Sequence, residues 1–164
     1  MGDLIVTTLI ISLSGVMAPG PVTAVTIGKG ARSPHAGAFL ALGHGVVELP
    51  LMVLLLAGLG TITRYPLFGA VVGSLGGVFL IVMGIDMIRR FRNPQLFSGD
   101  HGNRGALVSG VLLSAGNPYF LLWWATTGLV LIRRSSLLGL TGFVLFAVVH
   151  WLCDFGWLYF LSML

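Results

Sequence analysis

The feature that most constrains this chain is a series of apolar runs, each long enough to cross a membrane as a helix. Five runs qualify, at residues 4–27, 36–59, 66–88, 106–132 and 137–161. A spanning helix needs about 20 apolar residues at a rise of about 1.5 Å each. The runs do not alternate apolar with polar residues, as barrel strands would. The pattern therefore predicts an all-α, polytopic transmembrane helix bundle that forms a single domain over residues 1–164.

The composition excludes a soluble domain. Apolar residues make up 56% of the chain and charged residues only 9%, whereas an average soluble domain is about a quarter charged. The one charged residue before the first run is Asp3, so the basic segment of a signal peptide is missing. We therefore expect a retained helix and not a signal peptide. The single Cys153 excludes an internal disulfide and a Cys-x-x-Cys redox site, and is interpreted as a small apolar core residue.

The basic residues predict the topology. The joints after the first and third runs carry six of them: Lys29, Arg32, Arg89, Arg90, Arg92 and Arg104. The opposite side carries three: Arg64, Arg133 and Arg134. Because cytoplasmic joints are enriched in Lys and Arg, we expect a multi-pass plasma-membrane protein with its N-terminus outside. The net charge of +4 is thus interpreted as topology and not as a nucleic-acid surface.

Two halves of the chain repeat one pattern, a broken helix followed by a helix with a His and an acid four residues apart. The breaks are Pro19-Gly20-Pro21 and Gly116-Asn117-Pro118, and the pairs are His44 with Glu48 and His150 with Asp154. Because the first unit holds three helices, the second enters the membrane from the other side. This predicts an inverted repeat of three helices, with repeat one at about 1–93 and repeat two at about 104–164. Such repeats are typical of secondary transporters. Repeat two is incomplete, and we expect a sixth helix after residue 164.

Small residues recur at four-residue steps in two of the runs. They are Gly37, Ala41 and Gly45 in the second run and Gly69, Gly73 and Gly77 in the third. Such spacing lets helices approach closely in lipid. We expect packing within one chain, with a homodimer seam as the alternative.

The paired residues His44, Glu48, His150 and Asp154 are the candidate site for cargo or proton coupling. A charge at this depth costs at least about 2.5–3.5 kcal/mol and requires a partner or a water-filled path. Groups in a low-dielectric site titrate away from their ordinary values, which suits proton coupling. Each His shares a helix face with its acid, so the structural alternative is two self-satisfied pairs that lock the helices in place.

The two helix breaks supply partial positive charge, opposite to the charge of the acids. The half-helices that start after Pro21 and Pro118 offer unpaired N–H groups with a partial positive charge, which attract a carboxylate. An ammonium group would be attracted to Glu48 or Asp154, so a zwitterion such as an amino acid suits both ends. A simple kink is the alternative for each break. Trp123 and Trp124 are interpreted as packing or interface residues, with stacking on cargo as the alternative.

Three motifs in order resemble the LysE/RhtB family of amino-acid exporters. They are Met17-Ala18-Pro19-Gly20-Pro21, the Gly-rich stretch from Gly37 to Gly43, and Asn117-Pro118. The resemblance implies a six-helix inverted-repeat fold and export of amino acids or related metabolites. The residues it carries over are Pro19, Gly20, Pro21, Glu48, Asn117 and Pro118. Two features depart from the family pattern: Tyr119 stands where the family often has Lys, and the His44 and His150 pair is not a general feature of it.

The leading hypothesis is a proton-coupled exporter of amino acids or similar small metabolites. The alternative is a divalent metal-ion transporter that uses His44, Glu48, His150 and Asp154 as ligands. An enzyme is not expected, since no His-Glu-x-x-His motif is present. We expect no cofactor, and the expected partners are small-molecule cargo, protons and membrane lipid, with no nucleic acid.

The arginine bias generates a topology prediction. We expect Ser98→Cys, made in a Cys153→Ala background, to resist an impermeant maleimide in right-side-out vesicles until the membrane is permeabilised, because the 89–104 joint is cytoplasmic. Ser136→Cys on the opposite joint should label from outside. Ready labelling of position 98 in intact vesicles would reverse the assignment.

Overall fold

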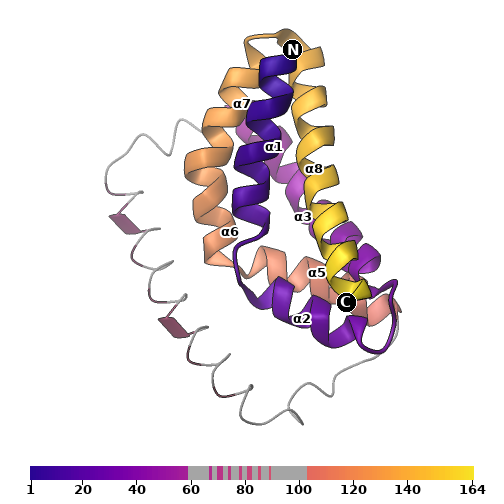
Figure 1. The fold of residues 1–164 in the computed structure, drawn as a ribbon. Helices are drawn as coiled ribbons and strands as arrows, with labels where there is room; N and C mark the ends of the chain where they lie inside the picture. The colour runs from indigo at the N-terminus through magenta and orange to yellow at the C-terminus, as the bar shows by residue number, and fades with distance from the viewer. Residues whose placement is uncertain are drawn as a thin grey trace.

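The computed structural model describes residues 1–58 and 103–164, with scattered helical positions between 67 and 89 (Figure 1). Every element in these described residues is a helix. The third expected span, 66–88, is described only at isolated positions such as Leu67, Val71 and Ile85, which are helical and exposed. Its glycine series, Gly69, Gly73 and Gly77, lies outside the described residues, as does most of the 89–104 joint.

The described helices follow the other expected runs closely. In chain order they are α1 (Gly2–Val16), α2 (Pro21–Gly30), α3 (Ala36–Leu56), α5 (Asn103–Ala115), α6 (Pro118–Trp123), the π-helical turn η3 (Trp124–Gly128), α7 (Leu129–Ser136) and α8 (Gly139–Met163). Both expected breaks are present, between α1 and α2 and between α5 and α6. The π-helical turn was not predicted. At the joint of α7 and α8, Gly139 adopts a φ of 71°, a conformation that glycine tolerates best.

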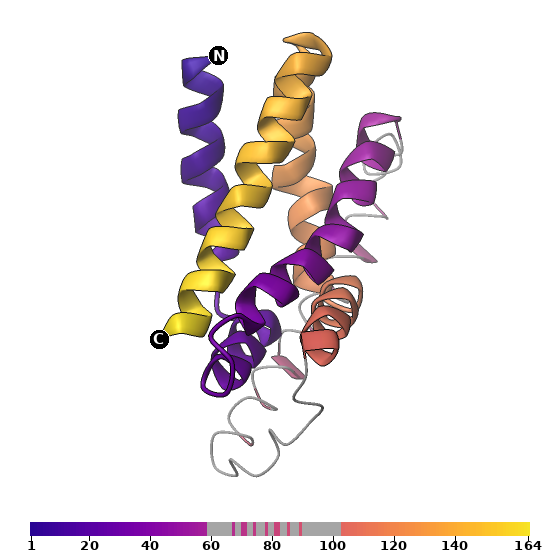
Figure 2. The ribbon, with the colours of Figure 1, turned by 90° about the vertical axis from the view of Figure 1, so that its right-hand side faces the viewer.

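Within the described residues, α3 and α8 are each long and apolar enough to cross a membrane alone. The other helices qualify only as bent pairs. The chain turns by 78° between α1 and α2, and by 57° between the Gly105–Ala115 and Tyr119–Ser136 segments. In both views α2 and α5 lie across the lower end of the bundle, below α1 and α7 and level with the C-terminal end of α8 (Figures 1 and 2). The described part therefore holds two spans, or up to four if each bent pair is one span.

Two polar contacts define the ends of the bundle. At one end the Arg134 guanidinium donates to the Asp3 carboxylate, so the N-terminus lies beside the α7–α8 joint. At the other, the Ser162 hydroxyl donates to the Pro34 carbonyl over 2.7 Å, which joins the C-terminal turn of α8 to the α2–α3 joint. These joints therefore alternate between the two ends, as the charge bias requires. Which end faces the cytoplasm stays a prediction.

The two long helices bury matching stripes at four-residue steps. On α3 the stripe is Leu40, His44, Glu48 and Met52; on α8 it is Phe146, His150, Asp154 and Leu158. Residues four apart share a helix face, so each stripe runs apolar, His, acid, apolar. Met52 and Phe146 belong to one apolar core cluster and Leu40 to another. The ionisable residues thus lie between the two apolar clusters.

The distribution of polar and apolar side chains between interior and surface is the reverse of that in a soluble protein. Thr8, Ser12, Glu48 and Asp154 are buried. Large apolar side chains, in contrast, lie exposed on every long helix, with Ile10 on α1, Val46 on α3, Leu112 on α5 and Leu152 on α8 among them. An apolar exterior around buried ionisable groups is typical of a bundle that faces lipid.

Glycines bring α3 and α5 into close contact. A Cβ added at Gly43 would overlap the Leu107 carbonyl oxygen, and one at Gly110 would overlap the Leu40 carbonyl oxygen. Gly37 likewise faces the Leu158 carbonyl of α8. These contacts lie within one chain, which agrees with the expected role of Gly37 in intramolecular packing.

The close contact generates a stability prediction. We expect Gly43→Ala to lower the melting temperature in detergent, because the added methyl group meets backbone atoms and overpacking costs about 1–3 kcal/mol. Gly156→Ala is the matched control, since a Cβ there meets open space and Ala favours a helix over Gly by about 1 kcal/mol. Equal melting temperatures for both variants would contradict the packing we describe.

Candidate functional site

A cavity of about 290 Å³ lies where the two helix breaks approach the α3 and α8 stripes. Its lining includes the first break, through Pro19, Gly20 and Pro21, and Asn117 of the second. It also includes all four ionisable candidates: His44, Glu48, His150 and Asp154. Gly116 is not among the lining residues, and the Pro118 side chain lies outside the described part of the chain. The remaining predicted site residues meet in one place.

The four ionisable side chains form one cluster and not two separate pairs. Glu48 Oε1 lies 3.1 Å from His44 Nε2 on its own helix and 3.1 Å from His150 Nε2 on α8. One carboxylate oxygen therefore links both imidazoles. The sequence pattern predicted contact within each i, i+4 pair, but the link between α3 and α8 depends on helix packing.

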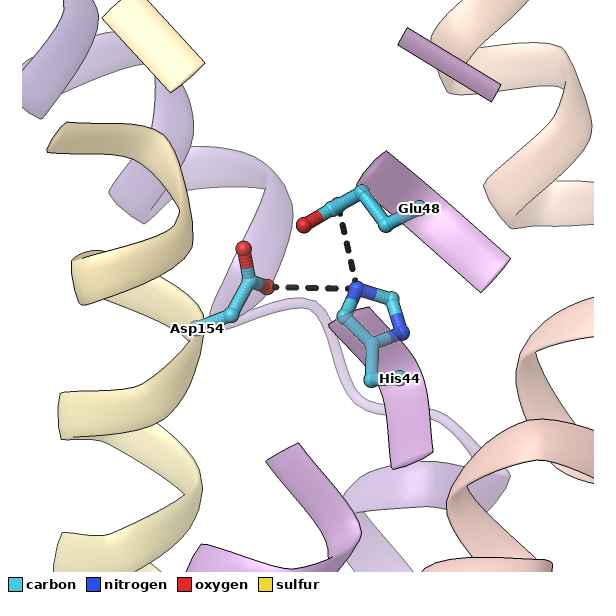
Figure 3. Close-up of side chains that lie close together, drawn as sticks. All are labelled: His44, Glu48 and Asp154. Carbon is cyan, nitrogen blue, oxygen red and sulfur yellow. Dashed lines mark hydrogen bonds and ion pairs between the residues drawn. The ribbon is translucent and has the colours of Figure 1, made fainter. Parts of the chain in front are cut away.

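Asp154 takes a looser place in the cluster. Its Oδ1 lies 3.7 Å from His44 Nε2, and its Oδ2 lies 3.4 Å from His150 Nε2. Figure 3 shows Asp154 facing His44 and Glu48 from α8. Two carboxylate oxygens, Glu48 Oε2 and Asp154 Oδ2, are buried and make no hydrogen bond. Such oxygens are acceptors for a cationic donor, because a buried acceptor without a partner is costly.

Each imidazole is anchored at its other nitrogen by a serine from a broken helix. His44 Nδ1 lies 2.6 Å from Ser114 Oγ on α5, and His150 Nδ1 lies 2.7 Å from Ser12 Oγ on α1. Both serines are fully buried. Sequence analysis missed them. The available signal was a hydroxyl in an apolar run close before a break, but serine is common in membrane helices, and only packing shows which serines face a histidine.

The two breaks differ in how their N–H groups are satisfied. Both α2 and α6 begin with proline, but the Asn117 side chain accepts a hydrogen bond from the Tyr119 N–H over 3.0 Å. At α2 the capping residue is Gly20, and no side chain caps the helix. We expected both half-helices to offer free N–H groups. In the structure Asn117 already caps α6, so α2 is the better anion site.

Aromatic rings surround the imidazoles. Trp123 stacks on His150 at a centroid distance of 5.1 Å and 23° between planes, and Phe120 meets His44 edge-on at 5.2 Å. Trp124 is only 1% exposed and also contacts His150. Both tryptophans therefore pack within the bundle, and both also line the cavity. The π-helical turn begins at Trp124, and such turns often occur at functional sites.

The cluster also has the spacing of a small metal site. Ligand atoms of His44, Glu48 and Asp154 lie within 4.8 Å of one another, and all three side chains are buried (Figure 3). A nitrogen with two carboxylates is a donor set that several divalent ions accept. The two carboxylates of this donor set also suit an ammonium group, which carries hydrogen-bond donors for both.

Buried ionisable groups beside broken helices, within a lipid-facing bundle, define a membrane transport protein. Residues 13–164 match the family model of the LysE type translocator, and the chain belongs to this family. The family comprises transporters and not enzymes, its members move small-molecule cargo, and the match does not favour a metal transporter. A search of curated proteins found no match to the chain, and a search of solved structures found none either.

The shared carboxylate oxygen generates a stability prediction. We expect Glu48→Ala to lower the melting temperature in detergent more than Asp154→Ala does. Loss of Glu48 leaves two buried imidazole nitrogens without their acceptor, at about 1–3 kcal/mol each, whereas Asp154 makes no side-chain hydrogen bond to either ring. A larger loss for Asp154→Ala would show that the looser contacts hold the bundle.

Proposed function

We propose that the protein is a proton-coupled exporter of amino acids or closely related zwitterionic metabolites. One observation carries the proposal: the cavity is lined both by Glu48 and Asp154, each with a carboxylate oxygen that makes no hydrogen bond, and by the uncapped start of α2. The two carboxylates suit an ammonium group, and the free N–H groups after Gly20 suit a carboxylate. A small molecule that carries both charges satisfies both ends at once.

The cavity wall and size narrow the cargo. Apolar and aromatic side chains form much of the wall, including Val16, Phe120, Trp123 and Leu158. No Lys or Arg is among the lining residues that the structure describes. A volume of about 290 Å³ lies at the lower end of the range of about 300–1,000 Å³ for ligand pockets. A small amino acid with an apolar side chain therefore fits better than one with an acidic side chain.

The arrangement of the two halves supports the inverted repeat that the sequence predicts. α1 packs on α8, and α5 packs on α3, so each first helix contacts the His-bearing helix of the other half. The serine anchors cross in the same way, from α1 to His150 and from α5 to His44. α3 and α8 run in opposite directions (Figure 2). Rocking of one half against the other would expose the cavity to each side in turn, in a plasma membrane with the N-terminus outside.

Proton coupling follows from competition for the same carboxylates. An ionised Glu48 or Asp154 attracts the cargo ammonium, while a protonated cluster has lost that attraction. Protons that enter from outside would then release cargo there, and loss of those protons to the cytoplasm would restore cargo binding. Such exchange drives export with an inward proton gradient, because one binding site cannot hold both charges favourably.

Flux into proteoliposomes tests this proposal directly. The panel comprises L-leucine, L-lysine, L-glutamate and Mn²⁺, each with and without a pH gradient. We expect pH-driven flux of leucine above that of the charged amino acids and no Mn²⁺ flux. Mn²⁺ flux without amino-acid flux would support the metal alternative instead, and flux of none of them would refute the proposed cargo class.

The paired acids generate a coupling prediction. We expect Glu48→Gln to remain folded, because an amide costs less to bury than a charge, yet to lose the response of leucine flux to the pH gradient or to stop transport. Asp154→Asn should act likewise, and more weakly if the site is asymmetric. Asp3→Asn is the matched control, since Asp3 pairs with Arg134 at the end of the bundle. Melting temperature and flux are measured on the same preparations, and wild-type flux in both Glu48→Gln and Asp154→Asn would exclude these acids as the coupling site.

A further inference from the structure

Two hydroxyls of α1 differ from the other buried hydroxyls that the structure describes. Thr26 donates to the Val22 carbonyl over 2.7 Å, and Ser135 donates to the Ile132 carbonyl over 2.9 Å. Such bonds to the preceding helical turn are the usual way to satisfy a hydroxyl in an apolar helix. The Thr8 side chain is fully buried, and its hydroxyl makes no hydrogen bond. Ser12, also fully buried, contacts His150 Nδ1 at 2.7 Å.

The two serine anchors also differ in where their hydrogen goes. Ser114 donates its one hydrogen to the Gly110 carbonyl over 2.6 Å, so its oxygen must accept from His44 Nδ1. His44 therefore carries a hydrogen on Nδ1, and a second one on Nε2, which contacts the Glu48 carboxylate at 3.1 Å. Nothing beyond Ser114 can pass a proton to Nδ1, because the Ser114 hydrogen is already donated to Gly110. Ser12 has no backbone acceptor in the described residues, so its hydrogen is free to be donated to His150 Nδ1.

We propose that protons reach the cluster along α1, through Thr8 and Ser12 to His150. The contact of Ser114 with His44, in contrast, positions that ring and carries no proton. This inference rests on the proton coupling proposed above and adds its route. Thr8 and Ser12 share one helix face, four residues apart, and Leu4 continues the same buried stripe toward the N-terminus. The two hydroxyls therefore lead from His150 toward the N-terminal end of the bundle, where the buried, apolar Leu4 follows them.

The proton balance of the step is simple. Before it, His150 carries its hydrogen on Nε2, which donates to Glu48 Oε1 over 3.1 Å. A hydronium ion that bridges the two hydroxyls donates a hydrogen bond to Thr8 Oγ1 and gives a proton to Ser12 Oγ, and Ser12 passes its own hydrogen to His150 Nδ1. The hydronium becomes water, Ser12 is unchanged, and His150 becomes an imidazolium paired with the Glu48 carboxylate. Glu48 is then less available to the cargo ammonium.

The groups around His150 agree with proton entry at one ring nitrogen, Nδ1. Glu48 and His44 face it from α3, and Asp154 faces it from its own helix at 3.4 Å. α1 contributes only the Ser12 hydroxyl, and the α6–η3 segment contributes the rings of Trp123 and Trp124. The carboxylates stabilise the imidazolium that the step forms, and among the described residues Ser12 makes the one hydrogen-bond contact to Nδ1.

Valine and alanine substitutions test the route in the full-length chain. We expect Thr8→Val and Ser12→Ala to slow pH-driven proton uptake, followed with a pH dye inside proteoliposomes, by about tenfold or more. In Thr8→Val, leucine–leucine exchange at equal pH, which moves no net proton, should stay within about twofold of wild type. Thr26→Val and Ser135→Ala are the matched controls, because each removes a buried hydroxyl that is bonded to the backbone. Thr8→Ser should restore proton uptake.

The outcomes separate this inference from the proposed function. Normal proton uptake in Thr8→Val and Ser12→Ala, or equal loss of uptake and exchange in Thr8→Val, would overturn the route. Proton-coupled leucine flux in wild type would still support the function. No coupled flux in wild type would refute the function itself.

A measurement without transport decides the same point if a variant is unstable. In ¹⁵N-histidine-labelled wild-type protein, the ring nitrogen shifts should show a hydrogen on His44 Nδ1 throughout the pH range in which His150 titrates. The His150 hydrogen should lie on Nε2, with Nδ1 gaining one on acidification. A neutral His150 ring fixed with its hydrogen on Nδ1 would overturn the route, because that nitrogen could not accept from Ser12.

Discussion

The shared oxygen of Glu48 is the contact on which the site depends. Both imidazoles approach it at 3.1 Å, one from its own helix and one from α8. A carboxylate buried to 1% exposure is stable only with partners, and here the partners belong to the two helices that carry the matching stripes. Within the site this contact links the two halves of the chain, and it leaves the second Glu48 oxygen without a hydrogen bond.

The broken helices support that contact in two ways. Their serines fix the far nitrogen of each imidazole, so the rings present Nε2 to the acids. Their breaks open the bundle beside the cluster and place a helix start in the same cavity. Asn117 caps one start and Gly20 leaves the other uncapped. The two halves are thus nearly symmetric in the arrangement of their helices but differ in the polar groups at their helix starts.

That asymmetry gives the two histidines different roles. The Ser114 hydrogen is donated to the Gly110 carbonyl, which keeps a hydrogen on His44 Nδ1, whereas Ser12 has no backbone acceptor among the described residues. A transporter needs one part of its site to remain rigid while another part exchanges cargo and protons. The rings of Phe120, Trp123 and Trp124 hold the imidazoles in place around the cavity.

Sequence by itself determined the class of protein, the bounds of the described spans to within a few residues, both breaks and the two His–acid pairs. It did so because burial in lipid and helix periodicity are local properties: run length, proline position and i, i+4 spacing all lie within one segment. Only the tertiary structure decided that the four side chains form one cluster, that Ser12 and Ser114 anchor the rings, and that α6 is capped while α2 is not. Those features depend on which helix faces contact each other. The contact of Ser12 with His150 joins residues 138 positions apart in the chain. A local sequence pattern cannot predict such a contact.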